Sequence, residues 1–182
     1  MRDVAIVGGG PGGLYVASLL ARRGFDVSLY EEHPSSGAPV HCTGVLAADA
    51  FDEFNLARDA VLNSLKTVYF HSPAGRSVAY SSERIEAVAV DRLRFDQQLH
   101  TEAAASGAAI ELGRPVDDVR VDRDGVTLEL RNGERARCRT VVLACGASYR
   151  LQRRLGLGLP AAHLQSAQAE LPSAAPGDSP PA

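Results

Sequence analysis

The chain has 182 residues, of which 45% are hydrophobic, and a formal net charge of −3. This composition supports a folded core and excludes a wholly disordered chain, and the negative charge gives no electrostatic reason to expect a nucleic-acid partner. No apolar run is long enough for a transmembrane segment or for the core of a secretory signal, so we expect a cytoplasmic protein.

The first elements are a strand, a glycine-rich turn, a helix and a second strand. Val4–Val7 is an apolar run of strand length, and glycine and proline fill positions 8–13. Apolar residues at helical spacing predict a helix from Gly12 to Arg23, and Val27–Tyr30 is typical of a strand. An acid, Glu31, follows that strand directly.

The turn has the Gly-x-Gly-x-x-Gly spacing that binds a dinucleotide when it lies between a strand and a helix. Gly8 supplies the tight turn, Gly10 lets a pyrophosphate approach the backbone, and Gly13 permits close packing of the helix on the strand. Free N–H groups and the dipole at the start of the helix favour the phosphates. Glu31, 18 residues after Gly13, places a carboxylate where ribose hydroxyls can donate to it. The cofactor-binding residues predicted on this segment are Gly8, Gly10, Pro11, Gly12, Gly13, Glu31 and Glu32.

The middle of the chain changes between irregular, helical and β-like segments. Residues 33–44 contain two prolines and are expected to form a loop after the second strand, where ligands lie in parallel sheets. Residues 47–62 are predicted to be helical, with a break near Asn55. Residues 67–71 and 76–80 are expected to form a β-hairpin around a Ser-Pro-Ala-Gly turn.

The second half begins with a helix and continues mainly with strands. Asp91–Ser106 is predicted to be helical and to end at Gly107. The Asn132-Gly133 pair marks a hairpin. Strands are expected over residues 109–112, 116–121, 126–130, 136–138 and 140–144, a helical turn over 150–155, a further strand over His163–Leu171 and a loose tail over Pro172–Ala182.

Four segments, taken in this order, carry a resemblance to a known family. They are GGGPGGL at 8–14 with Glu31, GAPVHCTG at 37–44, VDRLRFDQQL at 90–99, and VVLACGASYRLQRRLGLG at 141–158. The chain resembles the N-terminal portion of the FAD-dependent oxidoreductases of the geranylgeranyl-reductase and p-hydroxybenzoate-hydroxylase type. The PVHCTG segment is more similar to the prenyl-reductase branch than to the aromatic hydroxylases.

The resemblance implies an α/β fold of the Rossmann-like, three-layer type that binds FAD or NAD(P), with a parallel sheet, helices and a β-meander. Residues 1–160 would form the FAD-binding domain, with residues 63–90 as an inset that begins a substrate domain. Residues 161–182 would be a truncated entry into that domain followed by a loose tail. Because members of the family are longer, the hairpin is expected to be an incomplete piece of the substrate domain.

The resemblance also assigns site residues outside the glycine turn. Arg92 would contact the pyrophosphate or the ribityl chain of FAD, although its spacing equally suits a surface ion pair with Asp96. Cys42 and Gly44 would lie on a loop that approaches the flavin, and Gly146 would contact the cofactor at the end of the last apolar strand. For Cys42, a small residue packed in a loop is the alternative.

The cysteines indicate neither a metal site nor a disulfide framework, because Cys42, Cys138 and Cys145 are odd in number and lack a C-x-x-C spacing. Related sequences commonly carry Asp-Gly where Cys145-Gly146 stands, and a thiol is a poorer acceptor than a carboxylate. Cys145 is therefore expected to be a buried cysteine at a strand end rather than a nucleophile.

Two further features have alternative interpretations. His41 is either a proton donor or an ordinary polar residue on a loop. Arg150, Arg153 and Arg154 form a basic cluster, which suits a solvated helix face or a contact with a phosphate or a membrane surface.

Three functions stay open. The favoured one is an FAD-binding oxidoreductase domain, in which NAD(P)H or another donor reduces the flavin and the flavin passes hydride to a small-molecule substrate, an isoprenoid or an aromatic compound. It would be an enzyme if a C-terminal portion or partner half completed it. The alternatives are a non-catalytic remnant of such a flavoprotein and an NAD-binding dehydrogenase domain; the β-meander favours the flavoprotein. No residue is predicted to be a catalytic acid or base.

Overall fold

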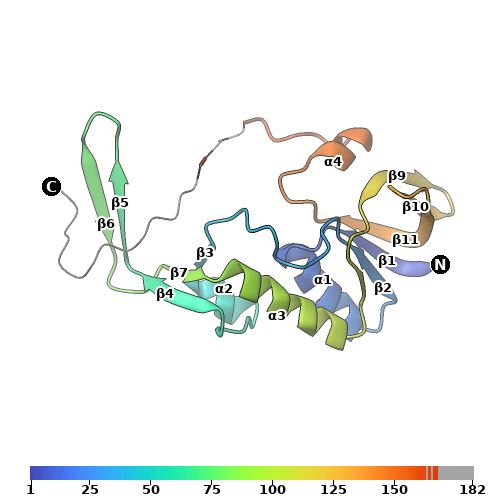
Figure 1. Cartoon of the computed structure of the whole chain (residues 1–182), viewed down its shortest axis with the longest axis horizontal. Helices are drawn as coiled ribbons and strands as arrows, with labels where there is room; N and C mark the ends of the chain where they lie inside the picture. The colour runs from blue at the N-terminus through green and yellow to red at the C-terminus, as the bar shows by residue number, and fades with distance from the viewer. Residues whose placement is uncertain (163, 165, 168–182) are drawn as a thin grey trace.

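The computed structural model describes residues 1–162, 164, 166 and 167. The strand expected over His163–Leu171 and the tail expected over Pro172–Ala182 lie largely outside these residues. Within the described part, helices and strands combine in layers, and the predicted α/β architecture is confirmed (Figure 1).

A six-stranded sheet with the order β8-β2-β1-β11-β10-β9 forms the centre of the molecule. The four strands β8, β2, β1 and β11 run parallel, and β9, β10 and β11 form an antiparallel meander. The strands are β1 (Arg2–Val7), β2 (Val27–Tyr30), β8 (Ala109–Glu111), β9 (Val116–Asp122), β10 (Gly125–Leu130) and β11 (Arg135–Leu143). The parallel part has the strand order of a dinucleotide-binding half-sheet, whose switch point lies at β1.

Two apolar cores lie on opposite faces of β1. Val4 and Ile6 pack into a core formed with the helices α1 (Pro11–Arg22) and α3 (Arg92–Ala105). Ala5 and Val7 pack into a second core with the side chains of the meander. Alternate residues of a strand point to opposite faces, so the part of a strand that is buried on both faces is apolar throughout, as residues 4–7 of β1 are.

The strand β11 joins two segments that the sequence analysis separated. Residues 136–138 and 140–144 were expected to be distinct strands, but Arg135–Leu143 is continuous. One edge of β11 pairs antiparallel with β10, with Val126 opposite Cys138, and the other pairs parallel with β1, with Val4 opposite Thr140. Arg139, the exposed residue between the two predicted strands, lies where the pairing with β10 ends and the pairing with β1 continues.

The helix expected over residues 47–62 is wrong beyond its first part. The helix α2 spans only Ala48–Glu53, and Asn55, where a break was predicted, has a positive φ of 50°. The chain then forms β4 (Val61–Leu65). Strand β4 belongs to a three-stranded sheet with the order β3-β7-β4, of which β3 (Val45–Ala47) and β7 (Ala87–Val90) were also missed. Strands this short carry too few residues for a clear period of two.

The predicted hairpin is confirmed as β5 (Thr67–His71) and β6 (Ser77–Ser81), which pair only with each other among the described strands. Figure 1 shows it extending from the small sheet, away from the six-stranded sheet. The short helix α4 (Arg150–Arg154) follows β11.

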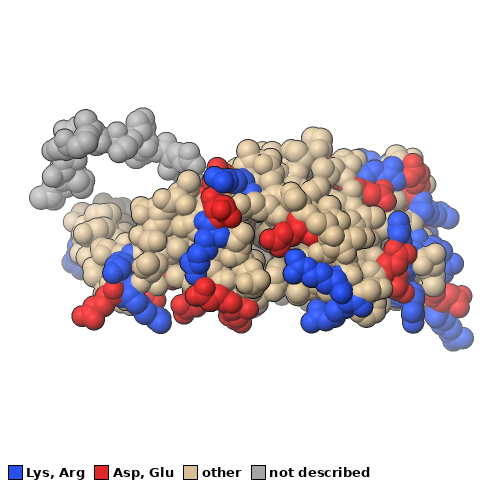
Figure 2. Space-filling model, turned by 90° about the horizontal axis from the view of Figure 1, so that it is seen from below, with Lys and Arg blue, Asp and Glu red and all other residues tan. Residues whose placement is uncertain are grey.

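The surface carries both signs of charge in close proximity. Figure 2 shows basic side chains beside acidic ones over one face of the molecule, and many of them form ion pairs, such as Arg139 with Asp3. None of the helices in the described part of the chain has the length and apolar character needed to cross a membrane.

Candidate cofactor site

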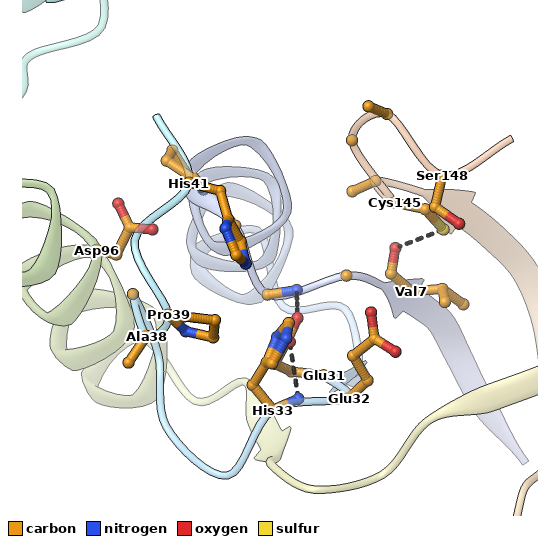
Figure 3. A pocket seen from close by; sticks show the side chains of 18 of the residues that line it. Val7, Glu31, Glu32, His33, Ala38, Pro39, His41, Asp96, Cys145 and Ser148 are labelled. Carbon is orange, nitrogen blue, oxygen red and sulfur yellow. Dashed lines mark hydrogen bonds and ion pairs between the residues drawn. The ribbon is translucent and has the colours of Figure 1, made fainter. Parts of the chain in front are cut away.

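A cavity of about 610 Å³ lies at the carboxyl ends of β1, β2 and β11. Its walls come from the glycine turn after β1, the loop after β2, the start of α3 and the segment that leads into α4 (Figure 3). Ligands of open α/β sheets bind at this edge, next to the point where the strand order reverses. The cavity therefore lies next to the segments that the sequence analysis predicted to bind the cofactor.

Of the three glycines that define the Gly-x-Gly-x-x-Gly motif, two permit close packing of the backbone and one leaves space for a ligand. Gly8 has a φ of 110°, and a Cβ on it would lie 2.3 Å from the carbonyl oxygen of Ala144. A Cβ on Gly13 would lie 2.0 Å from the carbonyl oxygen of Gly8. Gly10 lines the cavity and has no atom within 4 Å of a Cβ position. A side chain at position 10 would therefore occupy ligand space rather than protein.

The start of α1 lacks an internal partner for its dipole. Gly10 is its N-cap, no side chain caps it, and no acid stands in its first turn. The peptide N–H groups of a helix start carry a partial positive charge and bind anions. Pro11 lines the cavity at this point, whereas Gly12 and Gly13 do not.

Glu31 is buried and binds the glycine turn directly. Its Oε2 accepts from the N–H of Gly9 at 2.6 Å, and its Oε1 accepts from the N–H of His33 at 2.9 Å and contacts His33 Nδ1 (Figure 3). A carboxylate offers about four lone-pair positions, so an acceptor position remains on Oε2 for a ribose hydroxyl. The sequence analysis missed Gly9 and His33.

Gly9 has a steric role of its own. A Cβ there would lie 2.8 Å from the Cβ of Glu31, so the close bond between turn and carboxylate needs a glycine. The sequence signal for this contact was the run of three glycines at positions 8–10, because the motif requires glycine at only two of these positions. His33 carried none, because its bond to Glu31 depends on how the loop turns after β2.

Arg92 and Asp96 form an ion pair inside the cavity wall. Arg92 Nε and Nη2 donate to Asp96 Oδ1 and Oδ2, both at 3.0 Å. Their side chains are 17% and 5% exposed, and both residues line the cavity. The pair was expected as the surface alternative to a cofactor contact, yet it is buried at the site. Asp96 raises the pKa of Arg92, so the cavity keeps a fixed cation.

The loop after β2 brings a thiol beside this cation. Cys42 is exposed and lines the cavity, so it is not the packed residue of the alternative interpretation. A hydrogen bond from the Gly44 backbone lowers the pKa of Cys42, and the charge of Arg92 lowers it further. Gly44 itself packs against β7, since a Cβ there would lie 2.5 Å from the carbonyl oxygen of Val90. His41 also lines the cavity.

Across the cavity, Cys145 and Gly146 lie just after the end of β11. Cys145 is partly buried, its Sγ donates to the carbonyl oxygen of Val7 at 3.5 Å, and burial raises the pKa of its thiol. A raised pKa disfavours the thiolate, which is the nucleophilic form of cysteine. Gly146 lines the cavity with space where a Cβ would be. Cys138 is buried, and none of the described residues forms a cluster suited to a metal ion.

The basic cluster of α4 is bound to β9, which neither interpretation from sequence anticipated. Arg150 donates to the carbonyl oxygen of Val116 at 2.7 Å and to Asp117 Oδ1 at 3.2 Å. Arg154 pairs with Asp118 at 3.0 Å, and Arg153 is exposed. These contacts hold α4 at the cavity wall, because Arg150 and Arg154 lie four residues apart on one helix face and bind adjacent residues of β9.

The comparisons with known proteins agree with this geometry. A family model described as pyridine nucleotide-disulphide oxidoreductase matches residues 2–170. The chain is 31% identical over 125 residues to a digeranylgeranylglycerophospholipid reductase from Methanocaldococcus jannaschii, covering 68% of this chain and 31% of that protein. It is 32% identical over 170 residues to a rifampicin monooxygenase from Streptomyces venezuelae, covering 88% and 35%.

A solved structure shows the same arrangement. The crystal structure of a geranylgeranyl bacteriochlorophyll reductase-like protein from Thermoplasma acidophilum superposes with a TM-score of 0.74 at 28% identity, covering 86% of this chain and 42% of that one. The chain thus spans about a third of the length of the two relatives named above. With a family match over nearly all described residues, the chain belongs to the FAD/NAD(P)-binding oxidoreductases, and its relatives include geranylgeranyl-reductase-like proteins.

Proposed function

We propose that this chain is the FAD-binding domain of a flavin-dependent oxidoreductase of the geranylgeranyl-reductase-like type. The observation that carries the proposal is one cavity that combines an open glycine turn at an uncapped helix start, a buried carboxylate and a fixed cation. These groups match the chemistry of a dinucleotide, which has a pyrophosphate, ribose hydroxyls and extended polar chains.

Different residues of the cavity would bind different parts of FAD. The turn around Gly10 and the start of α1 would hold the pyrophosphate, and Glu31 would accept from the adenosine ribose. Arg92 would donate to a phosphate oxygen with the N–H groups that Asp96 leaves free. Bound FAD would supply hydride transfer, while the chain positions the cofactor and shields it from water.

The electron donor and acceptor are inferred from relatives. We infer NAD(P)H as the donor, because the matching family model is described as a pyridine nucleotide-disulphide oxidoreductase. We infer an isoprenoid double bond as the acceptor, because the name of the methanogen relative assigns it a digeranylgeranyl lipid. The rifampicin monooxygenase supports an aromatic substrate as the alternative. Turnover would need a C-terminal portion or partner half, because the chain spans only about a third of the length of these two relatives.

The domain boundaries remain part of the proposal. Residues 1–160 would form the FAD-binding domain, and the inset of residues 63–90 would begin a substrate domain. In support, the inset contains part of β4, the hairpin and β7, none of which pairs with the six-stranded sheet. Only β7 and the start of β4 pack against the core shared with the helices, through Val88 and Val90 above all.

A titration of the purified chain with FAD tests the proposal. Binding is followed by quenching of flavin fluorescence, with NADH as competitor. We expect saturable binding of FAD that NADH does not displace. Binding of NADH without FAD would instead establish the dehydrogenase alternative, and binding of neither to a chain that is folded by circular dichroism would establish the non-catalytic remnant.

A further inference from the structure

Glu31 keeps only one free acceptor position for a ligand. Its Oε1 accepts twice from His33, from the backbone N–H at 2.9 Å and from the ring nitrogen Nδ1, and its Oε2 accepts from the N–H of Gly9 at 2.6 Å (Figure 3). Each carboxylate oxygen offers about two lone-pair positions, so one position on Oε2 remains. The adenosine ribose presents two neighbouring hydroxyls, and a buried hydroxyl without a partner is costly. A second partner is therefore needed beside Glu31.

The contact with Glu31 fixes the position of a proton on the His33 ring. Two acceptors would repel each other at this contact, so Nδ1 carries a proton and donates to the carboxylate. The other ring nitrogen, Nε2, has no hydrogen-bond partner among the residues that the structure describes. A hydroxyl both donates and accepts, so it can pair with Nε2 whether or not this nitrogen is protonated. Nε2 is therefore open to a ligand hydroxyl.

His33 is held at the wall of the cavity by contacts on both sides of its backbone. Its carbonyl oxygen accepts from the N–H of Gly113 at 2.8 Å, just after β8, while its own N–H donates to Glu31. The residue lines the cavity, and its side chain is 39% exposed. Glu32 also lines the cavity, but it is exposed and forms no hydrogen bond or ion pair with any other described residue. The held ring of His33 loses less conformational freedom on binding than this carboxylate would.

We propose that His33 is a second ribose-binding residue: Glu31 Oε2 binds one hydroxyl of the adenosine ribose, and His33 Nε2 binds the neighbouring hydroxyl. The two residues together recognise a vicinal diol, which a deoxyribose lacks. This inference rests on the proposed binding of FAD, and it deepens the assignment of Glu31 to the ribose. It makes His33 a determinant of specificity for a ribonucleotide, in addition to its contact with Glu31.

Two substitutions separate the roles of the two ring nitrogens. In His33→Asn the amide nitrogen takes the place of Nδ1 and nothing replaces Nε2, whereas in His33→Gln the amide end takes the place of Nε2 and nothing replaces Nδ1. Without ligand, we expect His33→Asn to keep its Tm within about 2 °C of the wild type. His33→Gln should lower the Tm by about 3–6 °C, as for one lost hydrogen bond to a carboxylate.

Titrations with FAD, and with two FAD analogues that each lack one hydroxyl of the adenosine ribose, test the contact by flavin fluorescence. We expect His33→Asn to weaken FAD binding by about two- to tenfold, but to change the affinity for one of the analogues by less than about twofold. That analogue lacks the hydroxyl that His33 binds. His71→Asn is the matched control, because His71 also bonds through Nδ1, to Ser77 Oγ, but does not line the cavity; all three of its affinities should match the wild type.

Three results would overturn this proposal while FAD binding itself stays established. The first is unchanged affinity of His33→Asn for FAD. The second is an equal loss for FAD and for both analogues, because His33 would then act only through Glu31 or through the fold. The third is a Tm of His33→Asn as low as that of His33→Gln. A folded wild-type chain that binds neither FAD nor an analogue would instead refute the binding of FAD, and this inference with it.

Discussion

Replacing Glu31 by glutamine tests the link between the glycine turn and the rest of the site. The carboxylate accepts from Gly9 and from His33 while it is buried. A glutamine amide keeps one acceptor oxygen, so its NH₂ group must face one of these N–H donors. A hydrogen bond to a charged group contributes about 1.5–3 kcal/mol, and the variant loses at least one of them. For a chain of this length, a loss of about 2–3 kcal/mol lowers the Tm by about 4–12 °C.

Thermal unfolding followed by circular dichroism, without FAD, measures this loss. Glu32→Gln is the matched control, since Glu32 is adjacent and acidic but exposed, and we expect its Tm to stay within about 2 °C of the wild type. A Tm of Glu31→Gln that matches this control would refute the internal role of the carboxylate. In a separate FAD titration, Glu31→Gln should weaken binding by at least about tenfold through the lost ribose acceptor and the displaced turn; unchanged affinity would refute the ribose assignment.

Three other outcomes follow from the same structure. Gly10→Ala should fold with a nearly unchanged Tm but bind FAD at least about tenfold more weakly, because its Cβ would enter only the space of the ligand. Gly13→Ala should instead lower the Tm without any ligand, since its Cβ would lie 2.0 Å from a backbone oxygen. A lower Tm for Gly10→Ala together with weaker FAD binding by Gly13→Ala alone would contradict this division. Alkylation by iodoacetamide, resolved by peptide mass, should reach its half-maximal rate at lower pH for Cys42 than for Cys145, because the folded protein lowers one pKa and raises the other; equal midpoints would show that the surroundings of the two thiols do not differ in this way. Asp117→Asn should lower the Tm at pH 7 and flatten the acid loss of stability: Arg131 and then Arg150 lower the folded pKa of this carboxyl, so its contribution is present above the unfolded pKa of about 3.9 and is lost as the pH falls through the folded value. An unchanged acid transition would rule out that contribution.

The parts of the fold that sequence could predict are those whose signal is local. The segment from β1 through α1 to β2 follows from an apolar run, a glycine turn and a helical period within 30 residues. The hairpin and α3 follow from turn residues and from Asp91, which caps the helix by accepting from the N–H of Arg94. Each of these elements is fixed by neighbours in the chain.

The missed parts depend on partners far away in the chain. Strands β3 and β4 are held by β7, which follows them after the hairpin, and no local period marks them. The continuity of β11 depends on two different edges, one offered by β1 and one by β10. In the site, the residue type of Glu31 was predictable, but its bond to Gly9 crosses from one strand end to another. The burial of Arg92 and Asp96 likewise depends on the loop that covers them.

The position of the cavity couples ligand binding to the stability of the two cores but not to that of the hairpin. Val7 and Tyr30, which line the cavity, belong to the core shared with the meander, and Ala144, on the same wall, packs against the core shared with the helices. A ligand at this edge therefore contacts both cores, and binding to the folded state stabilises them together. The hairpin contributes no residue to either core, so a ligand in the cavity has no direct packing contact through which to stabilise it.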